Sequence, residues 1–380
     1  MLHTHSVAVA LLAAALAQAA PAQNVHRVGA GHFPSIQAAI DAAAPTDVVL
    51  VEAGVYPSFH VGKPLTITAE PSALVQVVDD DPVGIALQPM DRLHLAGLDV
   101  HVPAITIAGG MVSAERCTIA TRRGVRVVAG TLLLRWSSVG ALHGSGVLLQ
   151  NANLHASDST LTTAAGSSTA AECAAIEFQG SCLGFLSVCS VFGAWPGTAS
   201  APLPSPALLA TGITAPAVRV WLRTCTLVGG FGPASTLGPA VVAPASPAPA
   251  AIRHHQCLTA GPMVGAIATG PVLGLRSSAD LAIGGPFTTT MLGEAGHVFV
   301  FYFGSNVLGH FPIFEVEQPA MGFLDVVIFP AVVANALGEA SFPVAIPNDP
   351  VLRHSTLWWR GVDVSVFPWQ ATPAFVTVTQ

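Results

Sequence analysis

The side chains best suited to chemistry in this sequence are arginines, tryptophans and a histidine that recur at matched places along its middle: Arg135, Trp136, Trp221, Arg223 and His255. A tryptophan ring can stack on a sugar, and a guanidinium can pair with a uronate carboxylate through two parallel hydrogen bonds. These types at this spacing predict a strip that binds carbohydrate. The alternative is ordinary surface decoration, in which Glu115 and Arg135 form an exposed ion pair that contributes little to stability.

Acidic side chains offer only weak candidates for a metal site. Asp79, Asp80 and Asp81 are consecutive, and clustered carboxylates are typical calcium ligands. Consecutive side chains point in different directions, however, and the proline that follows is typical of a solvated turn. The fourteen histidines are dispersed, and only His254 and His255 are adjacent, which favours satisfied or surface histidines over copper ligands. We expect no bound metal and no cofactor.

The six cysteines fall into two groups. Four share one small-residue position of a repeated segment: Cys117, Cys189, Cys225 and Cys257. This position predicts an inward stack of free thiols. Disulfides between neighbouring coils are the alternative, but stacked side chains run parallel and suit the geometry of a bridge poorly. Cys173 and Cys182 lie off the pattern and form the candidate disulfide pair, which an exported chain would permit.

Composition limits the class of protein. Charged residues are 9% of the 380 residues, while glycine (36) and proline (30) are scattered throughout and interrupt helices. This texture predicts an all-β chain with many turns. The formal net charge is -7, with a single lysine, so we expect no nucleic-acid partner. No G-x-S-x-G motif is present.

The segments that contain these residues form a degenerate repeat. Examples are VSAERCTI (112–119), LLLRWSSV (132–139) and VWLRTCTL (220–227), each with apolar residues, a short bend and a small "slot" residue. The slot residues are Leu98, Cys117, Ser137, Ser159, Cys189, Cys225 and Cys257. Their intervals of 19, 20, 22, 30, 36 and 32 residues predict coils of a parallel β-helix, the later ones enlarged by insertions at 193–216 and 229–250. We expect those insertions to be passive loops; the alternative is that they line a binding face, as loops of repeat folds often do.

The two ends of the chain differ from this repeat. Residues 1–22 have an uninterrupted apolar stretch and an Ala-x-Ala site, which predicts a cleaved signal peptide. We expect a β-helix domain over residues 23–281, beginning with a short helix capped by Ser35. Alternating strands rich in phenylalanine then predict a small antiparallel β-sandwich over residues 282–380. No later segment is long and apolar enough to predict a membrane span.

The segments FPSIQAAIDAA (33–43), DVVLVEAGVY (47–56) and KPLTIT (63–68) resemble the N-terminal part of right-handed parallel β-helix proteins of the pectin-lyase-like superfamily, such as pectinesterases and periplasmic copper-site maturation proteins. The resemblance implies that the helix caps the open end of the solenoid. It does not carry activity. Pro57 and Ser58 stand where pectinesterases continue with glutamate, and their Gln-Asp-Thr and Asp-Phe-Ile-Phe-Gly motifs are absent.

The C-terminal segments GEASFPVAIPND (338–349) and STLWWRGVDVSV (355–366) resemble a β module found on many secreted bacterial proteins, with Arg360 where that module usually has glutamine. Taken together, the sequence predicts an all-β protein, a right-handed parallel β-helix followed by a β-sandwich, that is secreted, periplasmic or on the cell surface. We expect a non-catalytic role with polysaccharide as ligand. The alternative is a divergent polysaccharide lyase or glycoside hydrolase of the same fold.

Overall fold

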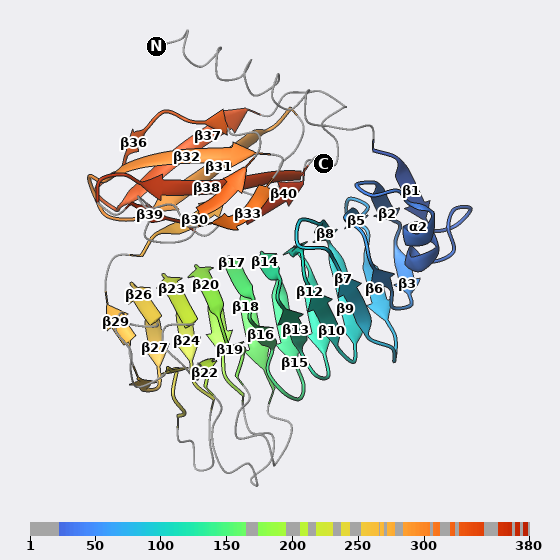
Figure 1. The fold of residues 1–380 in the computed structure, drawn as a ribbon, viewed down its shortest axis with the longest axis horizontal. Coiled ribbons are helices and arrows are strands. Elements are labelled where there is room, and N and C mark those ends of the chain that lie inside the picture. Colours follow the sequence, from blue (N-terminus) through green and yellow to red (C-terminus); the bar gives the residue numbers. More distant parts are fainter. Residues whose placement is uncertain are drawn as a thin grey trace. The chain divides into compact units, whose positions relative to one another are not determined.

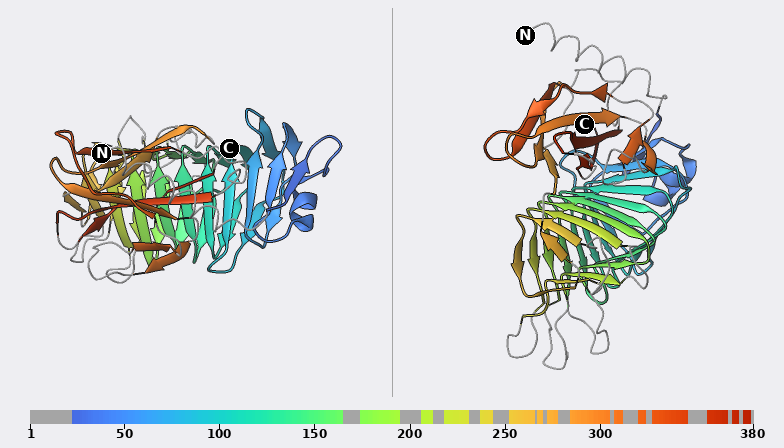
Figure 2. Two further views of the ribbon diagram at one scale, coloured as in Figure 1. Left: turned by 90° about the horizontal axis from the view of Figure 1, so that it is seen from above. Right: turned by 60° about the vertical axis from the view of Figure 1, so that its left-hand side comes forward.

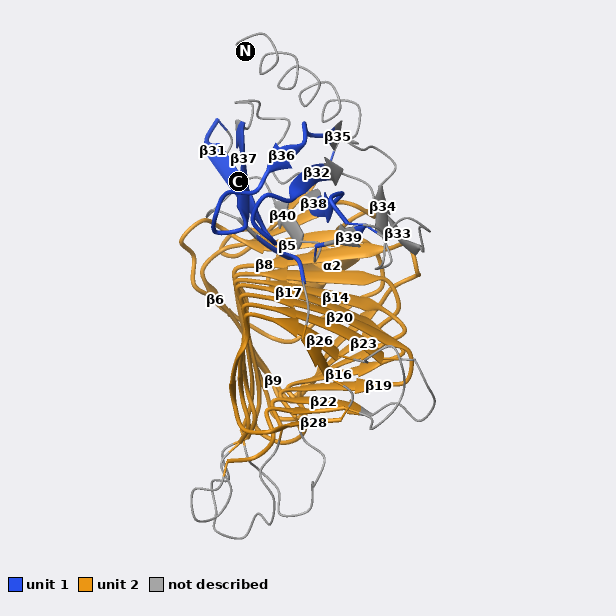
Figure 3. Ribbon diagram, turned by 90° about the vertical axis from the view of Figure 1, so that its left-hand side faces the viewer, with its two compact units in different colours: residues 1–23, 271–380 blue, residues 24–270 orange. Residues whose placement is uncertain are grey.

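The computed structural model describes residues 23–164, 174–194, 206–211, 218–230, 237–243, 252–265, 267–269, 272–277, 284–304, 307–311, 320–323, 327–345, 356–366, 369–372 and 375–378. The predicted signal peptide, residues 1–22, lies outside these ranges. The chain divides into two compact units, residues 24–270 and residues 271–380 with 1–23 (Figure 3). Among the described residues, no helix is both long and apolar enough to cross a bilayer.

The first unit is a parallel β-helix, as the repeat predicts. Each complete coil adds one strand to each of three parallel sheets, and successive coils stack in order along the unit (Figures 1 and 2). Among the described residues, sheet A has eleven strands. They are β1 (Val25–Val28), β2 (Val48–Val51), β5 (Leu65–Ala69), β8 (Arg92–Ala96), β11 (Met111–Glu115), β14 (Thr131–Arg135), β17 (Asn153–Ser157), β20 (Cys182–Ser187), β23 (Val218–Arg223), β26 (Ile252–His255) and β29 (Ile267–Thr269).

In the part of the chain that the structure describes, sheets B and C have nine strands each. Those of sheet B are β3 (Gly54–Tyr56), β6 (Val75–Val78), β9 (Leu98–Val102), β12 (Thr118–Thr121), β15 (Ser138–Ala141), β18 (Thr160–Thr163), β21 (Ser190–Phe192), β24 (Thr226–Val228) and β27 (Leu258–Ala260). Those of sheet C are β4 (His60–Val61), β7 (Val83–Ala86), β10 (Ile105–Ala108), β13 (Val125–Val128), β16 (Val147–Gln150), β19 (Ile176–Gln179), β22 (Leu208–Thr211), β25 (Val241–Val242) and β28 (Met263–Val264).

Two strands of sheet C correct the prediction for the insertions. β22 and β25 lie within residues 193–216 and 229–250, which were expected to be passive loops. Leu208 pairs with Ile176 of the coil before it and with Val241 of the coil after it, so the sheet continues through both insertions. Short apolar runs between prolines are enough to form these strands because both neighbours supply backbone partners.

Side chains along each strand point alternately into the interior and to the outer face. In β14, Leu132 and Leu134 join the continuous hydrophobic core, whereas Leu133 and Arg135 point to the outer face of sheet A. A single coil could not bury its apolar side chains alone, and stacking buries them between coils.

The N-terminal helix α2 (Ile36–Ala42) lies at the first end of the stack, beside β1 and β2 (Figure 1). The Ser35 hydroxyl oxygen accepts a hydrogen bond from the backbone N–H of Ala38 at 3.1 Å, which satisfies a donor of the first helical turn. Ile36 and Ile40 are buried in the core of the β-helix. The predicted helical cap is therefore confirmed.

The slot column explains how each coil turns from sheet A to sheet B. The residue before each slot has a positive φ; in the six non-glycine cases, Arg116, Trp136, Asp158, Val188, Thr224 and Gln256, it lies between 47° and 55°. In a typical coil, the Ser137 hydroxyl accepts a hydrogen bond from the N–H of Cys117 at 3.2 Å and donates to a backbone carbonyl such as that of Arg135 at 2.9 Å. Small polar or thiol side chains thus satisfy backbone groups that the bend leaves unpaired.

The slot cysteines are free thiols, as the stack predicts. Cys117, Cys189 and Cys225 are buried, and the backbone N–H of Cys225 donates to the Sγ atom of Cys257 at 3.4 Å. Burial raises the pKa of Cys117 to about 12, which keeps this thiol protonated and unreactive.

The second unit consists of antiparallel sheets, in agreement with the predicted strands. One sheet has β30 (Gly274–Ser277), β31 (Pro286–Leu292) and β37 (Glu339–Ala345). The next has β32 (Val298–Gly304), β35 (Val327–Ile328), β36 (Val332–Val333), β38 (Thr356–Asp363), β39 (Gln370–Ala371) and β40 (Phe375–Val378). A two-stranded sheet pairs β33 (Val307–Phe311) with β34 (Ala320–Phe323). The core of this unit is aromatic, with Phe301 stacked on Phe342 and Trp359. Arg360 is fully buried, and its Nε–H donates to the carbonyl of Thr372 at 2.9 Å.

Candidate binding surfaces

The outer face of sheet A carries the column predicted from the repeat. Strand register places one residue per coil side by side in the order Glu115, Arg135, Ser157, Ser187, Arg223 and His255. This register requires no insertion within the strands, because the extra residues of the longer coils fall outside sheet A. The sequence spacing was therefore sufficient to align the column.

A second outward column runs beside the first and was not recognised in the sequence. It comprises His94, Ser113, Leu133, His155, Phe185, Trp221 and Arg253. Its aromatic rings stack along the sheet: His155 on Phe185 at 4.7 Å between centroids, and Phe185 on Trp221 at 4.6 Å. Only Trp221 had been singled out, because Phe185 and His155 are unremarkable until the coils are aligned.

The predicted strip residues differ in accessibility. Arg135, Trp221 and Arg223 are buried, with exposed fractions of 2%, 6% and 2%, whereas Trp136 and His255 are half-buried. The side chains that ligand could reach in this structure are thus the half-buried members of the strip. Trp195, another tryptophan between the repeats, lies outside the described residues.

Trp136 is positioned by its neighbours. It occupies the bend between β14 and β15 with a φ of 47°, and its backbone N–H donates to the carbonyl of Ser157 at 3.2 Å. The Arg135 guanidinium carbon lies 4.0 Å from the centre of the Trp136 ring, which is cation–π geometry. A buried arginine therefore supports one face of a half-buried tryptophan.

The pair formed by Glu115 and Arg135 corrects the expectation of an exposed ion pair. Both side chains are 2% exposed, and Arg135 Nη1 donates to Glu115 Oε1 at 3.0 Å. In a buried pair, each charge depends on the other to offset the loss of hydration. The pair therefore matters more for stability than a surface pair would.

His94 and Ser113 meet beside this ion pair. His94 Nδ1 lies 2.6 Å from the Ser113 hydroxyl, while His94 Nε2 lies 3.8 Å from Glu115 Oε2 and has no hydrogen-bond partner among the described residues. This is the order of a hydroxyl nucleophile, a base and a carboxylate. Burial, with the positive charges of Arg116 and Arg135, lowers the pKa of His94 to about 3, which makes it a weak base at neutral pH. This group was not recognised in the sequence because His94 lies on β8, whereas Ser113 and Glu115 lie on β11 of the next coil.

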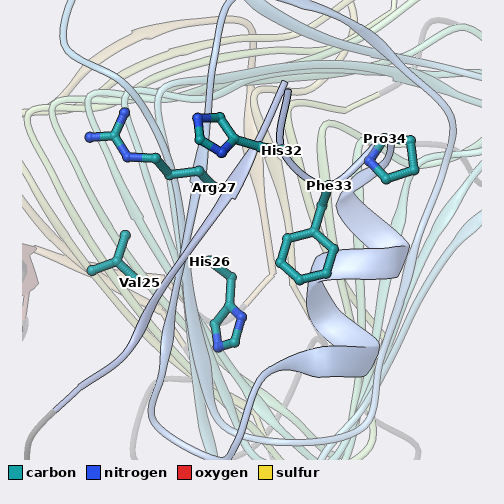
Figure 4. A pocket seen from close by; sticks show the side chains of 6 residues that line it. All are labelled: Val25, His26, Arg27, His32, Phe33 and Pro34. Carbon is teal, nitrogen blue, oxygen red and sulfur yellow. The ribbon is translucent and has the colours of Figure 1, made fainter. Parts of the chain in front are cut away.

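A pocket of about 470 Å³ opens at the first coil of the β-helix (Figure 4). Its lining comes from β1 and from the loop that follows it: Val25, His26, Arg27, His32, Phe33 and Pro34. The loop returns beside β1 because the N–H of Phe33 donates to the carbonyl of Arg27 at 3.0 Å. None of these residues had been proposed as a site, since no motif marks them.

Each basic side chain of this pocket lies beside a carboxylate. His26 Nε2 lies 2.9 Å from Asp47 Oδ2, Arg27 Nη1 lies 3.0 Å from Glu70 Oε1, and His32 Nε2 lies 3.6 Å from Glu52 Oε1. Burial raises the pKa of Asp47, but hydrogen bonds from His26 and from the N–H groups of Ala44 and Asn24 outweigh it, and the pKa is lowered overall. An ionised Asp47 therefore holds the His26 ring in place.

The weak metal candidates have separate hydrogen-bond partners. Asp79 Oδ2 accepts from the N–H and the hydroxyl of Ser58, and these bonds, the backbone one first, lower the pKa of Asp79. Asp80 pairs with Arg122 at 3.4 Å. Within the described ranges, no three His, Cys, Asp or Glu side chains gather in a way that could hold a metal ion.

The proposed disulfide remains a prediction. Cys173 lies outside the described residues. Cys182 is a free, buried thiol that contacts the carbonyl of Gln179 at 3.2 Å, and burial raises its pKa.

Comparison with known proteins identifies no family for this chain. No protein-family model matches this sequence, and no curated protein matches it. Among solved structures, the chain is similar to the A-module of the mannuronan C-5 epimerase AlgE6 of Azotobacter vinelandii, with 11% identity over 62% of this chain and 94% of that one. The TM-score is 0.26, which is too low for this likeness to indicate a function.

Proposed function

We propose that this chain is a non-catalytic, exported β-helix protein that binds acidic polysaccharide along the outer face of sheet A. The observation that carries the proposal is the strip itself, in which arginine, histidine and aromatic side chains recur from coil to coil in register. A polymer of repeating sugars offers carboxylates and ring faces at intervals, and a periodic surface can engage several of them together.

The residues of the strip differ in their expected roles because they differ in accessibility. Trp136, Arg253 and His255 are half-buried and would contact the glycan. Arg135 and Arg223 are buried and would act from beneath, Arg135 by supporting the Trp136 ring at 4.0 Å. Direct contact therefore falls on the bend at residue 136 and on strand β26.

The test is affinity electrophoresis of the purified protein through gels that contain polygalacturonate, alginate or a neutral glucan. We expect retardation by the acidic polymers, weaker for Trp136→Asn and for Arg253→Gln. Asparagine is chosen because residue 136 has a positive φ that asparagine tolerates. Arg126→Gln, on the outer face of sheet C, is the matched control and should leave the retardation unchanged. Equal mobility in all gels would reject the proposal.

The alternative of a divergent polysaccharide lyase or glycoside hydrolase has one observation in its favour, the contact between Ser113 and His94. A lyase would release unsaturated products that absorb ultraviolet light, and a hydrolase would release new reducing ends. Either product, lost in His94→Gln, would replace the non-catalytic proposal with this one.

A further inference from the structure

The pocket at the first coil depends on a loop, residues 29–33, that folds back beside β1 and packs close to Glu52. Gly29 follows β1 with a φ of 148°, and a Cβ atom there would lie only 2.1 Å from Glu52 Oε2. Gly29 N–H donates to the carbonyl of Phe33 at 3.1 Å. The glycine thus lets the loop fold back, which brings His32 and Phe33 beside Arg27 and His26 (Figure 4).

The polar side of the pocket can accept a further anion. Among the described contacts, Arg27 donates through Nη1 to Glu70, and a guanidinium has five N–H donors in all. The side chains of Arg27 and His32 are 49% and 43% exposed. Exposed ion pairs of this kind contribute little stability, so a ligand carboxylate can join or replace them.

The apolar side suits a ring. Phe33 is half-buried, and its ring lies 5.8 Å from that of His26 at an angle of 50°. Val25 and Pro34 complete the lining. A small inorganic anion would leave this surface unused, and a neutral sugar would leave the arginine unused.

We propose that this pocket binds one hexuronate residue of an acidic saccharide, with the sugar ring against Phe33 and the carboxylate on Arg27 and His32. The proposal rests on the proposed function for its ligand class, but it concerns a separate site on the first coil. A volume of about 470 Å³ lies within the range of pockets that take small molecules.

The test is isothermal titration of the whole chain with digalacturonate, with maltose as the neutral probe. We expect digalacturonate to bind and maltose not to bind. Arg27→Gln should weaken the binding by about tenfold or more, since it removes a charge-assisted hydrogen bond. Phe33→Leu should weaken it as well, and Arg126→Gln is the matched control. His32→Gln serves as the second polar variant if Arg27→Gln does not fold.

Failure here is distinguishable from failure of the proposed function. If digalacturonate does not bind, or binds Arg27→Gln as tightly as it binds the parent, the pocket proposal is wrong, whatever the polymer does. If Arg27→Gln weakens digalacturonate binding but Trp136→Asn and Arg253→Gln leave retardation by the acidic polymers unchanged, the pocket proposal stands and the strip proposal falls. Equal binding of maltose would overturn the assignment of an acidic sugar.

Discussion

The slot column and the outer strip lie on the same coils, and each coil contributes one residue to each of them. They differ in how much the residue type changes from coil to coil. Six of the seven slot residues are serine or cysteine, whereas the strip runs from Glu115 through Arg135 and two serines to Arg223 and His255. The slot side chain must accept from one backbone group and donate to another, as Ser137 does. No backbone requirement fixes the strip.

This difference separates architecture from recognition. A position that six of seven coils fill with serine or cysteine is set by the bend, because a small side chain that donates and accepts can complete the hydrogen bonds there. A position that changes from coil to coil is free to meet a ligand. Substitutions at the slot should therefore affect folding alone, while those at accessible strip positions should affect binding alone. The buried members of the strip should affect both.

The largest effect is expected for Arg135→Ala. This change leaves the Glu115 carboxylate buried without the guanidinium that now lies 3.0 Å away. Breaking a buried ion pair costs about 3 to 5 kcal/mol in the free energy of unfolding. Urea unfolding followed by circular dichroism measures it. The double variant Glu115→Gln, Arg135→Met should recover most of the loss; if it is no more stable than Arg135→Ala, burial of an unpaired charge is not the cause.

A smaller effect is expected at the slot. Ser137→Ala removes the acceptor for the N–H of Cys117, and an unsatisfied buried donor costs about 1 to 3 kcal/mol. Ser137→Cys, which installs the residue that four other coils use, should retain most of the stability. Urea unfolding of both variants makes the comparison. A cysteine variant as unstable as the alanine variant would contradict the hydrogen-bonding role of the slot.

Acid should lower the free energy of unfolding through His94. Its pKa falls from 6.5 to about 3 on folding, so between these values the unfolded chain binds a proton that the folded chain does not. The free energy of unfolding should therefore decrease as pH falls below about 6.5, by about 1 kcal/mol between pH 7 and pH 5.5 from this residue. His94→Gln should remove that part of the decrease. An unchanged pH profile in the variant would show that His94 is not responsible.

The smallest effect is expected at an exposed arginine. Arg126 Nε donates to Gln150 Oε1 at 2.8 Å on the outer face of sheet C, and the contact is exposed. Arg126→Gln should change the free energy of unfolding by no more than about 0.5 kcal/mol. A loss comparable with that of Arg135→Ala would mean that burial does not distinguish the two arginines.

The architecture could be predicted from the sequence because the spacing of the repeat determines which residues of successive coils are paired. The intervals between slot residues align Glu115 with Arg135 and Arg223 with His255, and the structure has that register. The strands within the insertions escaped prediction because Leu208–Thr211 and Val241–Val242 are too short to be recognised without their pairing partners.

The candidate surfaces were harder to predict. The ring stack of His155, Phe185 and Trp221 depends on three coils of different length, so no window of the sequence contains it. The pocket depends on a loop that folds back at Gly29, a conformation that local composition does not specify. The burial of Arg135 could not be predicted from the sequence either, since charged residues at alternate strand positions usually face water.

The most direct test of the central claim is a titration of the whole chain with polygalacturonate, combined with measurement of polymer length after incubation. We expect binding that weakens with added salt, is reduced in Trp136→Asn and is retained in Arg126→Gln, while the polymer keeps its length. Absence of binding, or equal binding by Trp136→Asn, would contradict the role of the strip, and a shortened polymer would contradict a non-catalytic function.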